Sequence, residues 1–113
     1  MQPLPETPIK TSHWNPVTDG PLSVESVGKK LGDMGYLCTC YTYAPGTLFP
    51  EHTHSVDKID VVLQGRFLVH INGENHVLLS GDYIFIPKGT LHRAAVMGDE
   101  DVVSIDAEKS VRE

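Results

Sequence analysis

The feature that most constrains this fold is the regular recurrence of turn-forming residues. Ten glycines and eight prolines divide the 113-residue chain into short runs rich in Val, Ile, Tyr and Thr. Turns that recur about every 8 to 12 residues are typical of antiparallel β-sandwiches and barrels, and they leave little room for a long helix. We therefore expect an all-β fold, and the chain length suits a single domain.

The strongest local signal is a β-hairpin at Asn72-Gly73, because this dipeptide favours the tight turn that joins two antiparallel strands. Other apolar or alternating runs between turn residues also predict strands. The expected strands cover residues 36–43, 59–63, 67–71, 77–79, 83–86, 92–97 and 101–105.

Residues 1–30 are expected to form an N-terminal arm, and residues 31–113 the barrel domain. Four of the eight prolines lie in the first 20 residues, which predicts an extended segment that lies along the body or reaches a neighbouring subunit. Trp14 is its expected anchor. Residues 21–30 have a weak amphipathic pattern interrupted by Gly28, so only short structure is expected there.

The net charge, the terminal sequence and the two cysteines limit the expected partners and cellular location of the protein. The net charge is −6 and the nine Lys and Arg residues are scattered, so nucleic acid is not an expected partner. No apolar run approaches the ~20 residues that span a bilayer, and residues 1–6 do not resemble a leader, so we expect a cytoplasmic protein without membrane contact. Cys38 and Cys40 share one strand face, where burial as small apolar residues is favoured over redox chemistry or metal binding.

Three histidines are the candidates for chemistry. His52 and His54 are two residues apart, and in an extended segment this spacing directs both imidazoles to one face, where they could share an ion. His92 follows the turn at residues 87–91, which can direct a third imidazole to the same interior. Spacing alone does not show that the three meet, and imidazoles that line a pocket without metal are the alternative.

Two spaced motifs in this sequence resemble those of the cupin family. The first has a glycine, a His-x-His pair and a second glycine at the family's spacing: Gly46, His52, His54 and Gly65. The second has a glycine, a Pro-x-Gly turn and a histidine: Gly81, Pro87, Gly89 and His92. The resemblance covers residues 36–105.

The resemblance implies a double-stranded β-helix, which is a jelly-roll barrel that is often dimeric. It also implies a divalent metal held in the barrel mouth by three histidines and one glutamate. The histidines would be His52, His54 and His92, and Fe, Mn, Ni, Cu and Zn all suit mixed imidazole and carboxylate ligands. A homodimer that binds a small-molecule substrate or ligand is the expected assembly.

Lys58 departs from the family pattern, because it stands where the pattern has its glutamate ligand. An unpaired ammonium group about 4 Å from a divalent ion is repelled by ~8 kcal/mol at an effective dielectric of ~20. Asp60 lies on the same strand face and could be the fourth ligand, with Lys58 paired to it or turned outward. Alternatively, Lys58 is an inward cation with Asp60 or Asp57 as counter-ion, and the metal-free pocket suits an acidic ligand. A third alternative is a desolvated Lys58 that acts as a base or nucleophile.

These residues lead to hypotheses of different classes. The first is a small metal-binding cupin that acts on a small polar substrate, with dioxygenase, isomerase and lyase chemistry all open. The second is a non-catalytic module whose pocket, with Lys58 in place of the glutamate, binds a small ligand. The third is a barrel that serves only for oligomerisation. Tyr41 and Tyr43 share a strand face and could line the pocket and orient a ligand, or pack in the core.

Overall fold

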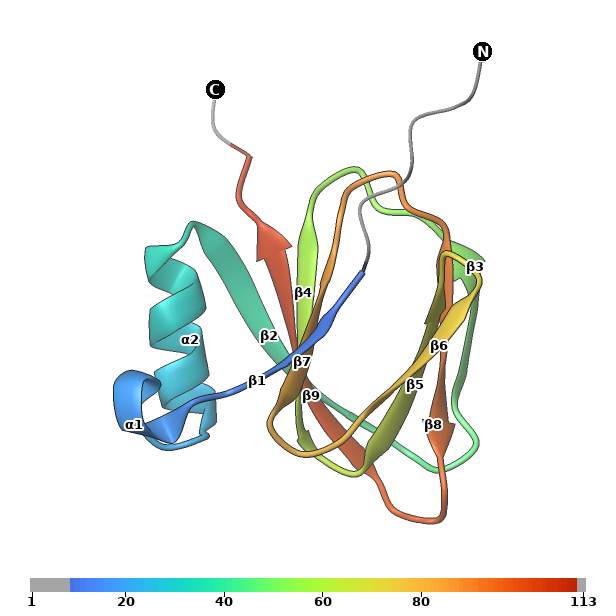
Figure 1. Cartoon of the computed structure of the whole chain (residues 1–113), viewed down its shortest axis with the longest axis horizontal. Coiled ribbons are helices and arrows are strands. Elements are labelled where there is room, and N and C mark those ends of the chain that lie inside the picture. Colours follow the sequence, from blue (N-terminus) through green and yellow to red (C-terminus); the bar gives the residue numbers. More distant parts are fainter. Residues whose placement is uncertain (1–8, 112–113) are drawn as a thin grey trace.

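Two antiparallel sheets face each other in the computed structural model, which describes residues 9–111 (Figure 1). One sheet has the strand order β1-β7-β4-β9-β2 and the other β3-β8-β5-β6. The elements are β1 (Thr11–His13), α1 (Pro16–Asp19), α2 (Val24–Asp33), β2 (Tyr36–Tyr43), β3 (Leu48–His52), β4 (Lys58–Gln64), β5 (Arg66–Ile71), β6 (Glu74–Leu78), β7 (Asp82–Ile86), β8 (His92–Met97) and β9 (Val102–Lys109). The arrangement confirms the expected double-stranded β-helix.

The hairpin expected at Asn72-Gly73 joins β5 to β6. Asn72 has φ 52° and Gly73 has φ 76°, so both central residues are in the left-handed region that the tightest hairpin turns require. The register pairs Ile71 with Glu74 directly across this turn. The sequence prediction is confirmed, and local turn chemistry explains it.

The segment before the barrel lies along its own chain. β1 pairs with β7, with Thr11 opposite Ile84. Trp14 is only 3% exposed, and its indole Nε1–H donates to the backbone oxygen of Gly20 at 2.8 Å. Trp14 is therefore the anchor that the sequence predicted. Residues 1–8 of the expected arm lie outside the described residues.

The expectation of only short structure before residue 30 is wrong, because α2 is a ten-residue helix. The side chain of Ser23 accepts a backbone N–H of the first turn and caps the helix. Val27 and Leu31, four residues apart, share the buried face, whereas a side chain at Gly28 or Gly32 would meet open space. The glycines therefore lie away from the packed face and do not break the helix. The boundary expected between residues 30 and 31 falls within α2.

The molecule has two apolar clusters, one on each side of the five-stranded sheet. Between the sheets, the side chains of Ile71, Leu78 and Ile84 are among those that pack together. On the outer face of the five-stranded sheet, α2 packs with Trp14 and residues of β4 and β9, and Figure 1 shows both helices on this side. The five-stranded sheet is therefore packed on both faces, and it carries part of the site described below. Neither helix in the described part of the chain is long and apolar enough to cross a bilayer.

Cys38 and Cys40 are both exposed, so the expectation that they are buried is wrong. β2 is the last strand of its sheet and pairs only with β9 within residues 9–111. An edge strand has fewer neighbours to cover it than a central strand has, and this position leaves both thiols open to solvent.

Candidate metal centre

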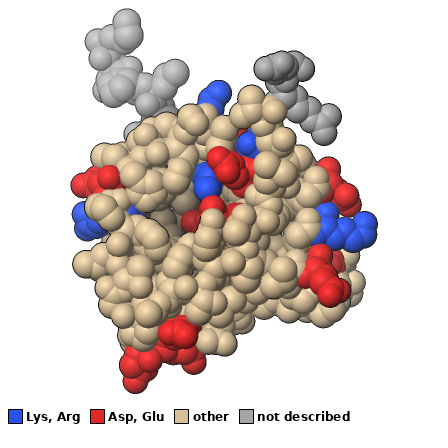
Figure 2. All heavy atoms as spheres, turned by 180° about the vertical axis from the view of Figure 1, so that it is seen from behind, with Lys and Arg blue, Asp and Glu red and all other residues tan. Residues whose placement is uncertain are grey.

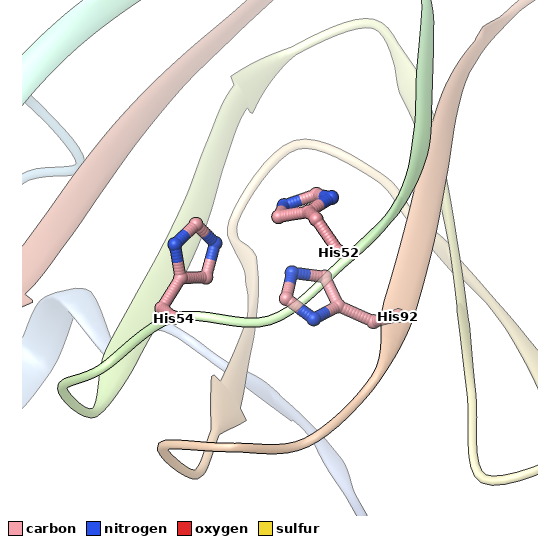
Figure 3. A group of neighbouring side chains, drawn as sticks. All are labelled: His52, His54 and His92. Atoms are coloured by element: carbon pink, nitrogen blue, oxygen red, sulfur yellow. The ribbon is translucent and has the colours of Figure 1, made fainter.

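Three imidazoles converge between the two sheets (Figure 3). His52 is the last residue of β3, His54 lies in the loop that follows, and His92 is the first residue of β8. His52 and His92 are direct partners across the β3–β8 ladder, and their ring centroids are 4.3 Å apart. The His54 ring lies 4.7 Å from that of His52 and 5.1 Å from that of His92. The structure thus brings together the three histidines that spacing alone could not join.

Backbone carbonyls orient two of these rings. The Nδ1 atom of His52 lies 2.7 Å from the Pro50 oxygen, and that of His92 lies 2.9 Å from the Thr90 oxygen. A carbonyl oxygen only accepts, so each Nδ1 carries the proton and donates it. The Nε2 atom of each ring then keeps its lone pair, which is the state in which a histidine binds a metal ion.

The surroundings favour neutral histidines. Burial lowers the pKa of His54, and the nearby charge of Lys58 lowers it further. Burial also lowers the pKa of His92, although its hydrogen bond to Thr90 acts in the opposite direction. Because a metal binds only the neutral imidazole, these shifts favour metal binding at neutral pH.

The donor set fits a divalent transition metal. One ligand atom from each histidine can be chosen so that all lie within 4.8 Å of one another. Nitrogens bound about 2.1 Å from one ion in tetrahedral geometry lie ~3.4 Å apart, so the ligand atoms would have to close by at most about 1.4 Å on metal binding. A three-histidine set leaves further coordination positions open.

Lys58 points into the same pocket and forms an ion pair that the sequence reasoning missed. Its Nζ atom donates to Asp106 Oδ2 at 2.7 Å, and the lysine is only 8% exposed. The expected counter-ions are wrong, because Asp57 instead accepts the backbone N–H of Lys88 at 2.8 Å, and Asp60 lies next to Asp106 rather than in an ion pair with Lys58. Lys58 and Asp106 are 48 residues apart, and only the β4–β9 register makes them neighbours.

Asp60 is a second carboxyl group beside this ion pair. It lies directly opposite Asp106 in the β4–β9 ladder, and the two side chains share a hydrogen bond. Burial, together with the charge of Asp106, raises the pKa of Asp60 to about 8. Asp60 is therefore largely protonated at neutral pH, and Asp106 is the carboxyl group that pairs with Lys58. The histidine cluster does not include Asp60, and its role as a metal ligand stays a prediction.

The histidines and the ion pair line one pocket of about 320 Å³. Tyr41, Tyr43 and Phe49 contribute aromatic walls to it. The ring of Tyr43 packs edge-on against Phe49, with centroids 4.9 Å apart, and Tyr41 stacks on Tyr43 at 5.9 Å. Both expected tyrosines thus line the pocket, and Tyr43 also packs against the core. A cavity of this size with apolar walls and a few convergent polar groups is typical of a small-molecule site.

The face drawn in Figure 2 carries charged side chains of both signs. Acidic and basic side chains lie side by side at several places on it, acidic side chains gather at its lower left, and it has no continuous area of basic charge.

The sequence of this chain matches the Cupin domain family over residues 40–108. The match covers more than half of the chain, which therefore belongs to the cupin family. This result confirms the resemblance drawn from the two motifs, and the three histidines of the candidate metal centre all lie within the matched region.

Individual relatives come from different organisms. Germin-like protein subfamily 1 member 4 of Arabidopsis thaliana is 34% identical over 68% of this chain and 39% of its own length. Quercetin 2,3-dioxygenase of Bacillus subtilis is 34% identical over 62% of this chain and 21% of its own length. The chain thus spans less than half the length of these two relatives. Among solved structures, KdgF from Halomonas sp. shares the fold, with a TM-score of 0.63 and 24% identity over 93% of this chain and 79% of that one.

Proposed function

We propose that this chain is a metal-binding cupin that acts on a small polar substrate held in the pocket between its sheets. The observation that carries the proposal is the convergence of His52, His54 and His92, two of them with Nε2 left free by hydrogen bonds at Nδ1. The family relationship to a quercetin 2,3-dioxygenase and a germin-like protein supports it. The bound ion would be Fe, Mn, Ni, Cu or Zn, and dioxygenase, isomerase and lyase reactions remain the candidate classes.

The residues around the histidines supply the remaining functions. A divalent ion, when bound, supplies Lewis-acid or redox chemistry to the pocket. Tyr41, Tyr43 and Phe49 provide flat apolar surfaces that exclude water from a small substrate. Asp60 holds a proton at neutral pH, and its hydrogen bond to Asp106 gives that proton a second acceptor. The two carboxyl groups can therefore exchange a proton with a substrate in the pocket.

Metal analysis tests this proposal. The chain is purified without chelators or a metal-affinity tag, and its metal content is compared with that of a His52→Ala, His54→Ala double variant. We expect about one ion per chain in the parent and near zero in the variant. Absence of metal from the parent, even after incubation with each of the five ions, would refute the proposal.

A second candidate is a non-catalytic module that binds a small acidic ligand. The observation that favours it is the Lys58–Asp106 ion pair, which places an ammonium group where the cupin pattern has a carboxylate ligand. The Lys58→Glu variant separates the candidates. If this second function is correct, the parent lacks metal and the variant gains it, whereas equal metal binding by both would contradict it.

A further inference from the structure

Neither helix of the described chain covers the outer face of the four-stranded sheet. Both helices lie on the other side of the molecule, where α2 packs against the five-stranded sheet (Figure 1). Side chains alternate along a strand. Phe67 and Val69 of β5 belong to the core between the sheets, so Leu68 points to the outer face. The outer face of the four-stranded sheet therefore presents apolar side chains that the core does not use.

A groove of about 510 Å³ lies on this face. Its lining includes an apolar row from three neighbouring strands, because Ala95 of β8 pairs with Leu48 of β3 and with Leu68 of β5. Leu48 is 73% exposed. Pro50 also lines the groove, where the register of β3 against β8 is irregular. The groove thus has the volume and the largely apolar lining that are typical of a small-molecule site.

Arg93 and His70 add polar groups beside the apolar row. They are direct partners in the β5–β8 ladder, and each is two residues from a member of the row. His70 uses its Nδ1–H to donate to Asn75 Oδ1 at 2.6 Å. Arg93 is exposed and takes part in none of the ion pairs within residues 9–111, and no acidic residue in that range lines the groove. The groove therefore places a guanidinium group without a counter-ion next to an aliphatic surface.

We propose that this groove binds a small aliphatic carboxylate, with the acid group on Arg93 and the alkyl chain along the apolar row. A guanidinium group matches a carboxylate through two parallel hydrogen bonds. Two residues of a strand span about 7 Å, so an alkyl chain of medium length reaches from Arg93 across Ala95. The groove is separate from the pocket between the sheets, and the proposal does not depend on metal binding.

The groove lies behind the wall that carries two of the histidines. Arg93 follows His92 in β8, and alternation directs their side chains to opposite faces of the sheet. Pro50 lines the groove, and its carbonyl oxygen accepts the Nδ1 proton of His52. A ligand in the groove would therefore contact the strands that position two histidines without entering the pocket.

Titration with octanoate, followed by the amide NMR shifts of the chain, tests the proposal. We expect a dissociation constant below about 1 mM. Butanoate should bind at least about tenfold more weakly, because it buries fewer CH₂ groups. Octan-1-ol has the same alkyl chain without the charge and should bind about fivefold more weakly than octanoate. Equal affinities for octanoate and either of the other two compounds, or no binding of octanoate at millimolar concentration, would overturn the proposal.

Removal of the guanidinium group tests the assigned cation. Arg93→Gln should weaken octanoate binding about tenfold, because a hydrogen-bonded ion pair is lost. Arg66→Gln is the matched control, since Arg66 lies on the same sheet face opposite Met97, outside the groove, and its loss changes the net charge equally. We expect this control to keep the affinity of the parent within about twofold. Equal losses in the two variants would show general charge attraction and would contradict the assigned site.

A charge in the apolar row tests where the alkyl chain binds. Leu48→Glu should fold because Leu48 is largely exposed, and its carboxylate should reduce octanoate binding more than about tenfold. Leu37→Glu, at a 65% exposed leucine of the other sheet, is the control and should bind octanoate as the parent does. Lys58→Met should also keep the affinity. If Lys58→Met abolishes binding and Arg93→Gln does not, the acid binds in the pocket between the sheets, and the proposed groove site is wrong.

Discussion

The two sheets contribute different chemistry to the pocket that lies between them. The four-stranded sheet supplies His52 and His92, from paired ends of β3 and β8. The five-stranded sheet supplies Lys58, Asp60 and Asp106, from β4 and β9. One wall therefore offers imidazole nitrogens, and the other holds an ion pair with a second carboxyl group beside it.

The two walls also differ in how their side chains are held. His52 and His92 each donate a hydrogen bond to a carbonyl two residues earlier in the chain, so local backbone geometry sets the orientation of each ring. Lys58 is held by a residue 48 positions away, so its orientation depends on the register of two strands. The comparison leads us to expect that substitutions on the histidine wall change metal affinity, whereas substitutions on the other wall change stability and charge.

The largest effect is expected from the removal of a histidine, which tests whether the histidine wall binds the metal. His92→Ala should weaken metal binding more than ~100-fold, because loss of an outer partner alone costs 10–100-fold and His92 is a direct donor. Isothermal titration with Zn²⁺ measures the change. His70→Ala is the control, since His70 bonds to Asn75 outside the cluster, and equal losses in the two variants would contradict the assignment.

A smaller effect, on stability rather than on metal, is expected on the other wall. Asp106→Asn leaves the ammonium group of Lys58 without its counter-ion, and we expect a loss of about 2 kcal/mol in urea unfolding. This is below the ~3–5 kcal/mol of a fully buried pair, because the Asp106 side chain is 26% exposed. Asp33→Asn breaks the exposed pair with Lys29 and should cost less than ~0.5 kcal/mol. Similar losses for the two variants would mean that the pocket pair is no stronger than a surface pair.

Removal of the Lys58 charge tests whether this ammonium group weakens metal binding at the histidines. Lys58→Met should tighten Zn²⁺ binding by about tenfold, because the ammonium group repels a cation at the histidines and Asp106 cancels only part of that repulsion. Lys29→Met, on the exposed face of α2, serves as the control and should leave the affinity unchanged. Weaker binding by Lys58→Met would show that the lysine supports the metal site instead of opposing it.

A pH dependence of stability is expected from Asp60. Its pKa rises from 3.8 to about 8 on folding, so its contribution to stability is fully present below pH ~4 and is lost as the pH rises toward ~8. Asp60→Asn keeps a donor for Asp106 but cannot ionise. We expect its melting temperature to match that of the parent near pH ~4 and to exceed it by a margin that grows as the pH rises toward ~8. Asp99→Asn, in an exposed turn, should show no such difference, and a flat Asp60→Asn comparison would contradict the raised pKa.

Sequence patterns anticipated the elements that depend on local chemistry. The hairpin at Asn72-Gly73, the strand Tyr36–Tyr43 and the anchor Trp14 all have the expected places. The helix α2 was underestimated, because Gly28 suggests a break when it is considered without the face on which it lies.

The three histidines were identifiable because two spaced motifs carry them, although their meeting depends on the pairing of β3 with β8. Asp106 was not identifiable, because no motif marks it and its partner Lys58 lies on another strand. Knowledge that β9 continues past Ile105 and pairs with β4 would have placed Asp106 opposite Asp60.

The sequence by itself thus indicated the family, the order of the strands and the three histidines that converge, because turn chemistry and motif spacing act over a few residues. Only the tertiary structure decided the counter-ion of Lys58, the protonation of Asp60 and the exposure of β2. Each of these depends on which strands are neighbours and on how much water they exclude, and strand register across the whole sheet sets both.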